Sequence, residues 1–123
     1  MAGKFFLGTY MTELAKDEIL VEIRLPALAP QTGCAYEKLK RKTGDWATAA
    51  AVVVMRLDGG VVSQVRIALT NLAPTALRAT DAANRAMAVC DPAEDLRGNA
   101  EYKTAMAGQM LRRAIAKAAA RCA

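Results

Sequence analysis

The stretch VVVMRLDGGVVSQVRIAL, residues 52–69, decides how the rest of this 123-residue chain is interpreted. Its first part, Val52 to Leu57, is rich in β-branched and apolar residues, which favours a central strand. Asp58 to Gly60 follows with residues that tolerate positive φ, as a tight hairpin turn requires. The return strand, Val61 to Leu69, alternates in polarity. Its inner face would carry Val65, Ile67 and Leu69. The sequence therefore predicts an antiparallel hairpin in the middle of the chain.

Two further strands are predicted before this hairpin. In the first, apolar and mostly polar positions alternate, which is typical of a strand with one buried face. The apolar positions are Ile19, Val21, Ile23 and Leu25. Pro26 then ends this strand. The second predicted strand is Cys34 to Lys42, polar on both faces beyond Leu39. Asp45 would then cap a short alanine-rich helical turn that begins at Trp46.

After residue 70 the apolar residues take helical spacing. One stripe predicts a helix from about Pro74 to Val89. Asp91, followed by proline at the first helical position and by Glu94, predicts the start of a second helix. A third helix runs from Ala100 almost to the end. With strands first and helices last, residues 1–123 are expected to form a single α+β domain.

The composition excludes several kinds of site. The chain has no histidine, so the usual general base near pH 7 and the Ser-His-Asp and Cys-His arrangements are excluded. Zinc would have too few nitrogen and sulfur ligands at usable spacing. The three cysteines are predicted to be reduced structural thiols: Cys34, Cys90 and Cys122. No apolar run is long enough to cross a bilayer, and no signal peptide is recognisable, so we expect a cytoplasmic protein without a membrane partner.

The segment YEKLKRKTGDW, residues 36–46, concentrates basic charge in a chain whose net charge is +5. If it forms a strand, Tyr36, Lys38, Lys40 and Lys42 share a face that could meet a phosphate or a planar ring. The alternative favoured by residue types alone is a solvated sheet edge, where lysines prevent strand-to-strand aggregation. Nucleic-acid binding is a third reading, but no known nucleic-acid motif accompanies the charge, so such a partner is not expected. No glycine-rich nucleotide-binding loop is present.

Longer segments carry a resemblance to a known family. They are FFLGTYMTEL, DEILVEIRLP, YEKLKRKTGDWATAAAVVVM, VRIALTNLAPTALRA and DPAEDLRGNAEYKTAMAGQMLRRA. In this order and spacing they resemble the C-terminal domain of the FAD-binding medium subunit of molybdenum hydroxylases. The aerobic carbon monoxide dehydrogenase type is the nearer likeness and the xanthine dehydrogenase flavin subunit the more distant one. YEKxxRxxGDWA and DLRGxAEY are the specific motifs, and the resemblance covers nearly the whole chain.

The resemblance implies a three- to four-stranded antiparallel sheet packed against a C-terminal helical bundle. It implies an oxidoreductase complex in which a molybdenum subunit and an iron–sulfur subunit pass electrons to FAD, with this domain as part of the wall around the flavin ring. By match to the motif, Tyr36 is expected near the flavin with Lys38 beside it. Asp45 is expected to fix the loop that borders the flavin site.

Two departures from the family pattern shape the functional expectation. The FAD-binding domain, which carries the glycine-rich pyrophosphate contacts, precedes this domain in the family, and here Met1 lies just before the junction. We therefore expect no tight FAD binding and no catalysis by this chain alone. The stretch between Arg78 and Asp91 also looks shorter than in the family by about one helix. An incomplete bundle would favour the alternative of a self-associating interaction module, such as a homodimer, that kept the fold without the enzyme.

Overall fold

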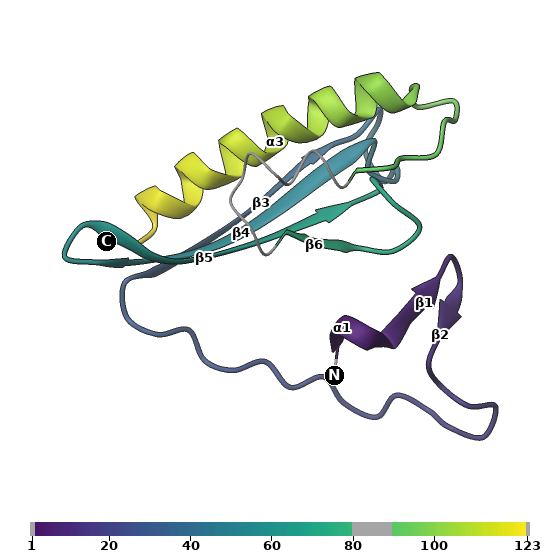
Figure 1. The fold of residues 1–123 in the computed structure, drawn as a ribbon, viewed down its shortest axis with the longest axis horizontal. Coiled ribbons are helices and arrows are strands. Elements are labelled where there is room, and N and C mark those ends of the chain that lie inside the picture. The colour runs from purple at the N-terminus through teal and green to yellow at the C-terminus, as the bar shows by residue number, and fades with distance from the viewer. Residues whose placement is uncertain (1, 80–89, 123) are drawn as a thin grey trace.

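The computed structural model describes residues 2–79 and 90–122 (Figure 1). Its centre is a four-stranded antiparallel sheet in the order β3-β4-β5-β6. These strands are β3 (Thr32–Leu39), β4 (Ala49–Asp58), β5 (Val61–Thr70) and β6 (Leu77–Ala79). One long helix, α3 (Ala100–Ala120), lies along one face of this sheet. The α+β class and the four-stranded antiparallel sheet predicted from the sequence are confirmed.

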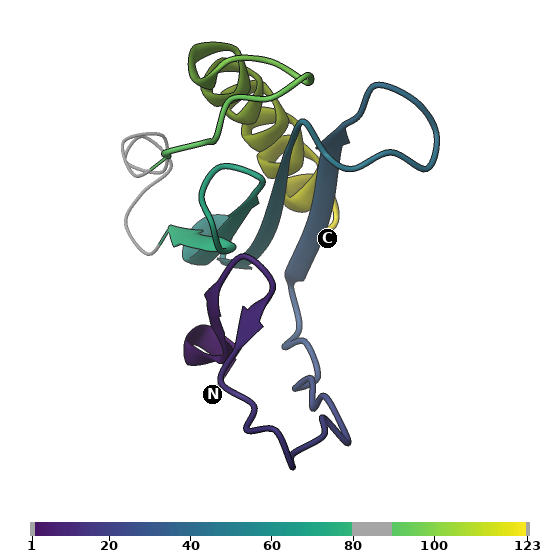
Figure 2. The ribbon, with the colours of Figure 1, turned by 90° about the vertical axis from the view of Figure 1, so that its right-hand side faces the viewer.

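A small N-terminal unit lies at the other side of the sheet from α3 (Figures 1 and 2). It consists of α1 (Ala2–Phe5), β1 (Phe6–Gly8) and β2 (Met11–Thr12), and the two strands pair as a separate antiparallel ribbon. Residues 13–31, which we call the arm, then run in an extended path to the start of β3. The arm is mostly solvent-exposed.

The central hairpin forms as the sequence predicts. β4 and β5 pair from Ala50↔Thr70 to Asp58↔Val61, and Gly59 and Gly60 take φ of +57° and +82° at the turn. Two consecutive positive φ values are the signature of the type I′ turn, whose twist matches that of the strands. Ile67 and Leu69 are buried on the inner face, as predicted. Val65 is 37% exposed because it lies on a part of β5 that β6 does not reach.

Helix α3 covers one face of β3 and β4 with small and medium apolar side chains. Asn99 begins the helix by accepting a hydrogen bond from the Tyr102 amide at 2.9 Å. The buried apolar residues of the helix repeat at helical spacing: Ala107, Met110, Leu111, Ala114 and Ala118. They pack against alternate residues of the strands, among them Ala35, Ala51, Val53, Met55, Ile67 and Leu69. Alanine predominates at this contact, and its short side chain lets the helix approach the sheet closely.

The closest approach of strand to helix occurs at Gly33. A Cβ atom added there would lie 2.0 Å from the carbonyl oxygen of Ala118. The Gly33 amide donates to Cys122 Sγ at 3.2 Å, and that buried sulfur also lies 3.3 Å from the carbonyl oxygens of Met55 and Ala118. Cys122 is therefore a buried thiol, as predicted, and it joins β3, β4 and the end of α3.

Several predicted elements before the hairpin are wrong or need new bounds. Residues 19–25 form no strand, because no neighbouring strand among residues 2–79 and 90–122 offers them backbone partners. The strand predicted to run from Cys34 to Lys42 begins at Thr32 and ends at Leu39, before a turn that contains Gly44. No helical turn follows Trp46. The alanines there start β4, because pairing with Leu39 and with Thr70 overrides their helical preference.

The predicted helices after the hairpin also need correction. Residues 77–79 form strand β6 on the edge of β5, so the predicted helix from Pro74 does not begin there. The rest of that predicted helix, residues 80–89, lies outside the described residues. Asp91 starts no helix. The segment that follows is irregular and closes with a bridge between Asp95 and Gly98. The last predicted helix is confirmed, so within the described residues α3 alone covers the sheet.

Candidate functional site

The face of the sheet opposite α3 carries the predicted cofactor-facing residues. Along β3, Gly33 and Ala35 are buried beneath the helix while Cys34, Tyr36 and Lys38 alternate to the other side and are exposed. Tyr36 is 53% exposed. The predicted alternation is confirmed for Tyr36 and Lys38, which lie two residues apart on one open surface. We call this surface the open face. Lys40 and Lys42, predicted on the same face, lie beyond the end of β3 at Leu39.

The strand register shows what surrounds Tyr36 on the open face. Tyr36 lies opposite Val52, Val52 opposite Ala68, and Ala68 opposite Arg78, so one row of side chains crosses all four strands. The valine and alanine in the middle are short and half-buried, while the tyrosine and arginine at the ends are exposed. The row is thus a low apolar floor between an aromatic ring and a cation. A flat ring or a flat partner surface could rest on it.

Positive charge surrounds this floor. Cys34 lies opposite Val54 and Val54 opposite Arg66 in the next row, while Lys38 lies opposite Ala50 on the other side of Tyr36. Lys38, Arg66 and Arg78 are all exposed. Cations on a partly apolar surface attract anionic groups such as a phosphate or a reduced flavin ring.

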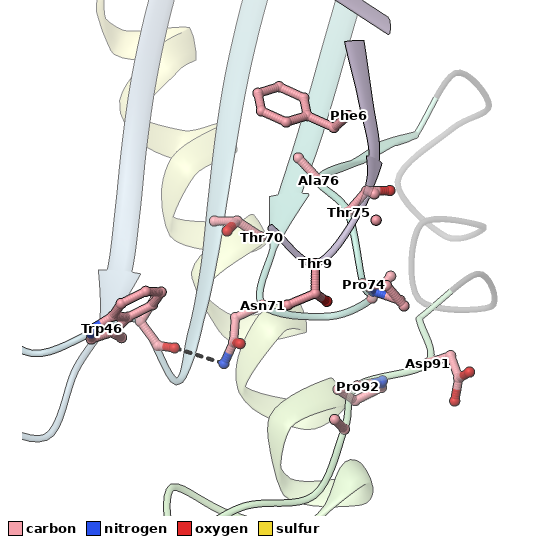
Figure 3. Close-up of a pocket in the computed structure, with 14 residues that line it drawn as sticks. Phe6, Thr9, Trp46, Thr70, Asn71, Pro74, Thr75, Ala76, Asp91 and Pro92 are labelled. Atoms are coloured by element: carbon pink, nitrogen blue, oxygen red, sulfur yellow. Dashed lines mark hydrogen bonds between the residues drawn. The ribbon is translucent and has the colours of Figure 1, made fainter. Parts of the chain in front are cut away.

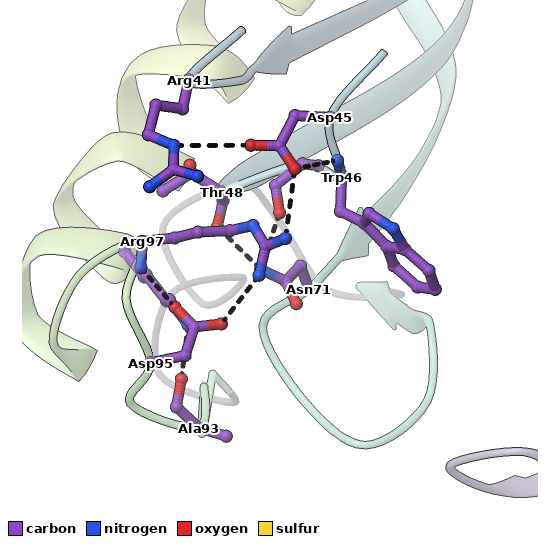
Figure 4. Close-up of polar contacts among 10 residues, drawn as sticks. Arg41, Asp45, Trp46, Thr48, Asn71, Ala93, Asp95 and Arg97 are labelled. Carbon is purple, nitrogen blue, oxygen red and sulfur yellow. Dashed lines mark hydrogen bonds and ion pairs between the residues drawn. The ribbon is translucent and has the colours of Figure 1, made fainter.

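Asp45 has a different environment from Tyr36 and Lys38. Its carboxylate accepts a hydrogen bond from Arg97 Nη2 at 3.1 Å and one from the Trp46 amide at 2.8 Å (Figure 4). Arg41 Nε lies 3.7 Å from the second carboxylate oxygen. The side chain of Asp45 is only 8% exposed, so it is held inside the protein rather than presented to a ligand. Asp45 therefore fixes the position of the loop that precedes Trp46.

The ion pairs continue from Arg97 to helix α3. Arg97 Nη1 lies 3.6 Å from Asp95, and Asp95 in turn pairs with Lys103 Nζ at 2.9 Å. Lys103 is 1% exposed, and its ammonium also donates to the Ala93 carbonyl oxygen. A buried ammonium needs such partners because its desolvation is costly. The five residues that form this charged chain are Arg41, Asp45, Arg97, Asp95 and Lys103.

The charged chain shifts the ionisation of its members. The hydrogen bond from Arg97 lowers the pKa of Asp45 below its usual value of 3.8 despite partial desolvation, with the Trp46 amide adding to the effect. The hydrogen bond from Lys103 lowers the pKa of Asp95 in the same way. Asp45 raises the pKa of Arg97. All three groups are thereby held in their charged forms.

Sequence reasoning found part of this arrangement. It placed Tyr36 and Lys38 on one face and assigned Asp45 to holding a loop. It did not predict that Arg97, Asp95 and Lys103 would be the partners of that aspartate. The two specific motifs could have indicated these partners. YEKxxRxxGDWA contains Arg41 and Asp45, and DLRGxAEY contains Asp95 and Arg97. The two motifs meet in the fold.

A hollow of about 590 Å³ lies at the end of the sheet, near Trp46 (Figure 3). The N-terminal ribbon contributes Phe6 and Thr9, and the segment after β5 contributes Asn71 and Pro74. Asn71 takes a positive φ of 63° and donates from its side-chain amide to the carbonyl oxygens of Ala47 and Thr48. Tyr36 and Lys38 do not line this hollow, so the predicted site is an open surface and not a cavity.

Residues 2–79 and 90–122 contain no cluster of three or more histidine, cysteine, aspartate or glutamate side chains placed to hold a metal ion. In the same ranges no helix combines the length and the apolar character needed to cross a membrane.

Comparison with known proteins agrees with the motifs that meet at Asp45. Residues 34–87 match the family model of the CO dehydrogenase flavoprotein C-terminal domain. Over 99% of its length, the chain is 60% identical to the carbon monoxide dehydrogenase medium chain of Hydrogenophaga pseudoflava. The chain belongs to the CO dehydrogenase flavoprotein C-terminal domain family. It is also 44% identical, over 98% of its length, to the medium chain of Afipia carboxidovorans.

Solved structures support this CO dehydrogenase flavoprotein domain assignment. The chain superposes with a TM-score of 0.92 on a chain of the carbon monoxide dehydrogenase from Hydrogenophaga pseudoflava, a structure that lacks the Mo-pyranopterin moiety of the molybdenum cofactor. The match covers 99% of this chain and 48% of that one. The chain thus spans about half the length of the relatives it matches. The resemblance inferred from the motifs is confirmed.

The same comparison bears on the predicted shortening between Arg78 and Asp91. The alignment with the Hydrogenophaga medium chain runs over 139 positions, whereas this chain has 123 residues, so the chain lacks residues at some aligned positions. A shortening of the domain relative to this relative is therefore real. Its location between Arg78 and Asp91 stays a prediction.

Proposed function

We propose that this chain forms one wall of the FAD site in a molybdenum hydroxylase complex of the carbon monoxide dehydrogenase type. In that role it positions and tunes the flavin and takes no bond-making step itself. The observation that carries the proposal is the open face, where Tyr36 and Lys38 stand exposed at one end of a low apolar floor.

The residues of the open face fit a flavin ring as a wall, not as a complete site. An exposed aromatic side chain and a floor of Val52 and Ala68 suit contact with a planar ring. The pyrophosphate of FAD would need backbone amides of a glycine-rich loop or a helix N-terminus, and the sequence carries no such motif. This division leaves the pyrophosphate contacts to the FAD-binding portion of a medium chain, with iron–sulfur and molybdenum subunits beyond it.

When bound, FAD would supply the two-electron and one-electron redox steps of such a complex. Lys38 would stabilise negative charge on a reduced flavin ring because its ammonium is exposed on the same face as Tyr36. Asp45 would keep the loop at Trp46 in place, since Arg97 and Arg41 hold its carboxylate. Tyr36 would cover the ring and limit the access of water to it.

Replacing Lys38 with glutamine in the complex assembled with an FAD-binding medium-chain half tests the proposal. Loss of a cation near the ring should lower the flavin midpoint potential by roughly 30 mV, about a tenfold change in the equilibrium constant of a two-electron couple. Lys117→Gln is the matched control, because Lys117 lies on α3 and pairs with Glu37 on the other side of the sheet. Equal potentials for the Lys38 variant and wild type would refute the assigned role.

A second test follows from assigning only the contact with the flavin ring, and not the pyrophosphate contacts, to this chain. Titration of the purified chain alone with FAD should show no sub-micromolar binding, because the phosphate contacts are not supplied. Fluorescence of the flavin measures this directly. Sub-micromolar affinity for the isolated chain would show that it holds a complete FAD site, and the proposal of a wall would then be wrong.

A further inference from the structure

A second, smaller hollow lies where the turn after β3 meets the segment that leads into α3. Its volume is about 140 Å³. Pockets for drug-sized molecules begin at roughly 300 Å³, so this hollow has room for a small ion but not for a flavin or a nucleotide. Two leucines form its apolar wall, and its polar lining consists of Lys40, Arg41, Thr48, Arg97 and Tyr102.

Positive charge exceeds negative charge around this hollow. Lys40, Arg41 and Arg97 line it, and no acidic side chain of the described residues does. Behind it, the charged chain holds three cations and only two carboxylates, which leaves an excess of one positive charge. Lys40 adds a second, because it is exposed and forms no ion pair within residues 2–79 and 90–122. The hollow therefore favours an anion.

Arg97 is the member of the charged chain best suited to such an anion. Its two terminal nitrogens hold Asp45 and Asp95, while its buried Nε has no hydrogen-bond partner among the described residues (Figure 4). Asp45 Oδ2 also lacks a hydrogen bond, but Arg41 lies 3.7 Å from it and balances its charge. A buried N–H group without an acceptor is rare in proteins and indicates an ion or a water molecule beside it.

The chemistry of the lining selects the kind of anion. The hydrogen bond with Asp45 raises the pKa of Arg97, so this side chain stays cationic. A guanidinium presents its donors as a planar fork that matches phosphate oxygens better than an ammonium does. Thr48 is only 4% exposed and carries a hydroxyl group that can donate to a further oxygen.

We propose that this hollow is a binding site for a small tetrahedral oxyanion, with phosphate as its representative. The bound anion would neutralise the excess positive charge and connect the turn after β3 to the segment before α3. It would thereby hold the loop before Trp46 more firmly than the charged chain does alone. The proposal is independent of the flavin-wall role, because Tyr36 and Lys38 do not line this hollow.

Titration of the full chain with inorganic phosphate at constant ionic strength tests the proposal. Isothermal titration calorimetry should show saturable binding with a dissociation constant of about 1 mM or tighter. Lys40→Gln and Arg41→Gln should each weaken this binding at least about tenfold, because each removes a cation from the lining. Lys42→Gln is the matched control: it makes the same charge change at a neighbouring position outside the lining, and should weaken binding less than about twofold.

Thermal unfolding provides a second measurement of the same site. Phosphate at ten times its dissociation constant should raise the unfolding midpoint of the wild-type chain and of Lys42→Gln by about 4 °C. Any general stabilisation by phosphate as a salt would also appear in Lys40→Gln, so the difference between these variants isolates the bound anion. Without phosphate, the midpoints of all variants should lie within about 2 °C of wild type, because the three side chains are exposed.

Glycerol phosphate distinguishes the source of the anion. Affinity equal to that of inorganic phosphate would assign the site to the phosphate group of a longer molecule, and affinity at least about tenfold weaker would assign it to the free ion. Absence of saturable phosphate binding to the wild-type chain would show that the hollow holds only water, and would overturn the proposal. Equal weakening by Lys40→Gln and Lys42→Gln would also overturn it, since diffuse surface charge would then account for the binding.

Discussion

The two faces of the four-stranded sheet differ in burial and in chemistry. Beneath α3, the strands present Ala51, Val53 and Leu69, each 1% exposed or less. Gly33 lies so close to the helix that a side chain of even one carbon atom would not fit there. On the open face, one residue further along each strand, tyrosine, lysine and arginine stand in solvent. The period of two along a strand places these two sets of side chains on opposite faces. Residues that build the fold and residues offered to a partner therefore alternate, and neighbouring substitutions should differ sharply in their effects.

The largest difference is expected between Gly33 and Cys34. Gly33→Ala should lower the free energy of unfolding by about 3 kcal/mol, because the new Cβ would collide with the backbone of α3. Cys34→Ala, on the next residue but on the open face, should change it by about 0.5 kcal/mol or less. Urea denaturation followed by circular dichroism measures both. Similar losses for the two variants would remove the contrast between the faces.

Two lysines on α3 sharpen the comparison within one helix. Lys103→Met should cost about 3 kcal/mol of unfolding free energy, because it removes the ammonium that holds Asp95 and the Ala93 carbonyl. Lys117→Met should cost about 0.5 kcal/mol or less, since the Lys117 side chain is 57% exposed and water screens its charge. Thermal unfolding at matched pH compares them. A Lys103 variant as stable as wild type would show that packing alone fixes this end of the helix.

The smallest effect is expected from acid. The folded-state pKa of Asp45 is lowered, so the unfolded chain binds more protons in acid and stability falls as pH decreases. The contribution should be complete above the usual carboxyl value of 3.8 and be lost progressively as pH falls through the lower folded-state value. Asp45→Asn should flatten this part of a curve of unfolding free energy against pH. An unchanged slope in the variant would contradict the assignment to Asp45.

The parts of the fold that could be predicted are those whose signals are local. The Asp58–Gly60 turn and the spacing in α3 contain their own evidence, because turn chemistry and helical periodicity act within a few residues. β6 could not be predicted in this way. Leu77-Arg78-Ala79 has no strand preference, and the edge of β5 determines its conformation. The arm shows the opposite case, in which a strand pattern is present and its neighbour is not.

The candidate site divides along the same line. Alternation along β3 was sufficient to place Tyr36 and Lys38 together on one face. The partner of Asp45 could not be found in this way, because Arg97 lies 52 residues further along the chain and only the fold brings them to 3.1 Å. The sequence did contain the second motif, DLRGxAEY, but did not show its role. In the fold this motif contributes Asp95 and Arg97 to the charged chain.

This charged chain also limits how such domains can be recombined. The loop before Trp46 contains no regular structure of its own, and its shape depends on charges supplied by the segment that leads into α3. A chimera that takes the loop from one relative and that segment from another would combine charged residues that are not matched to each other. The two motifs are therefore a single unit of exchange, although their paired residues Asp45 and Arg97 lie 52 residues apart.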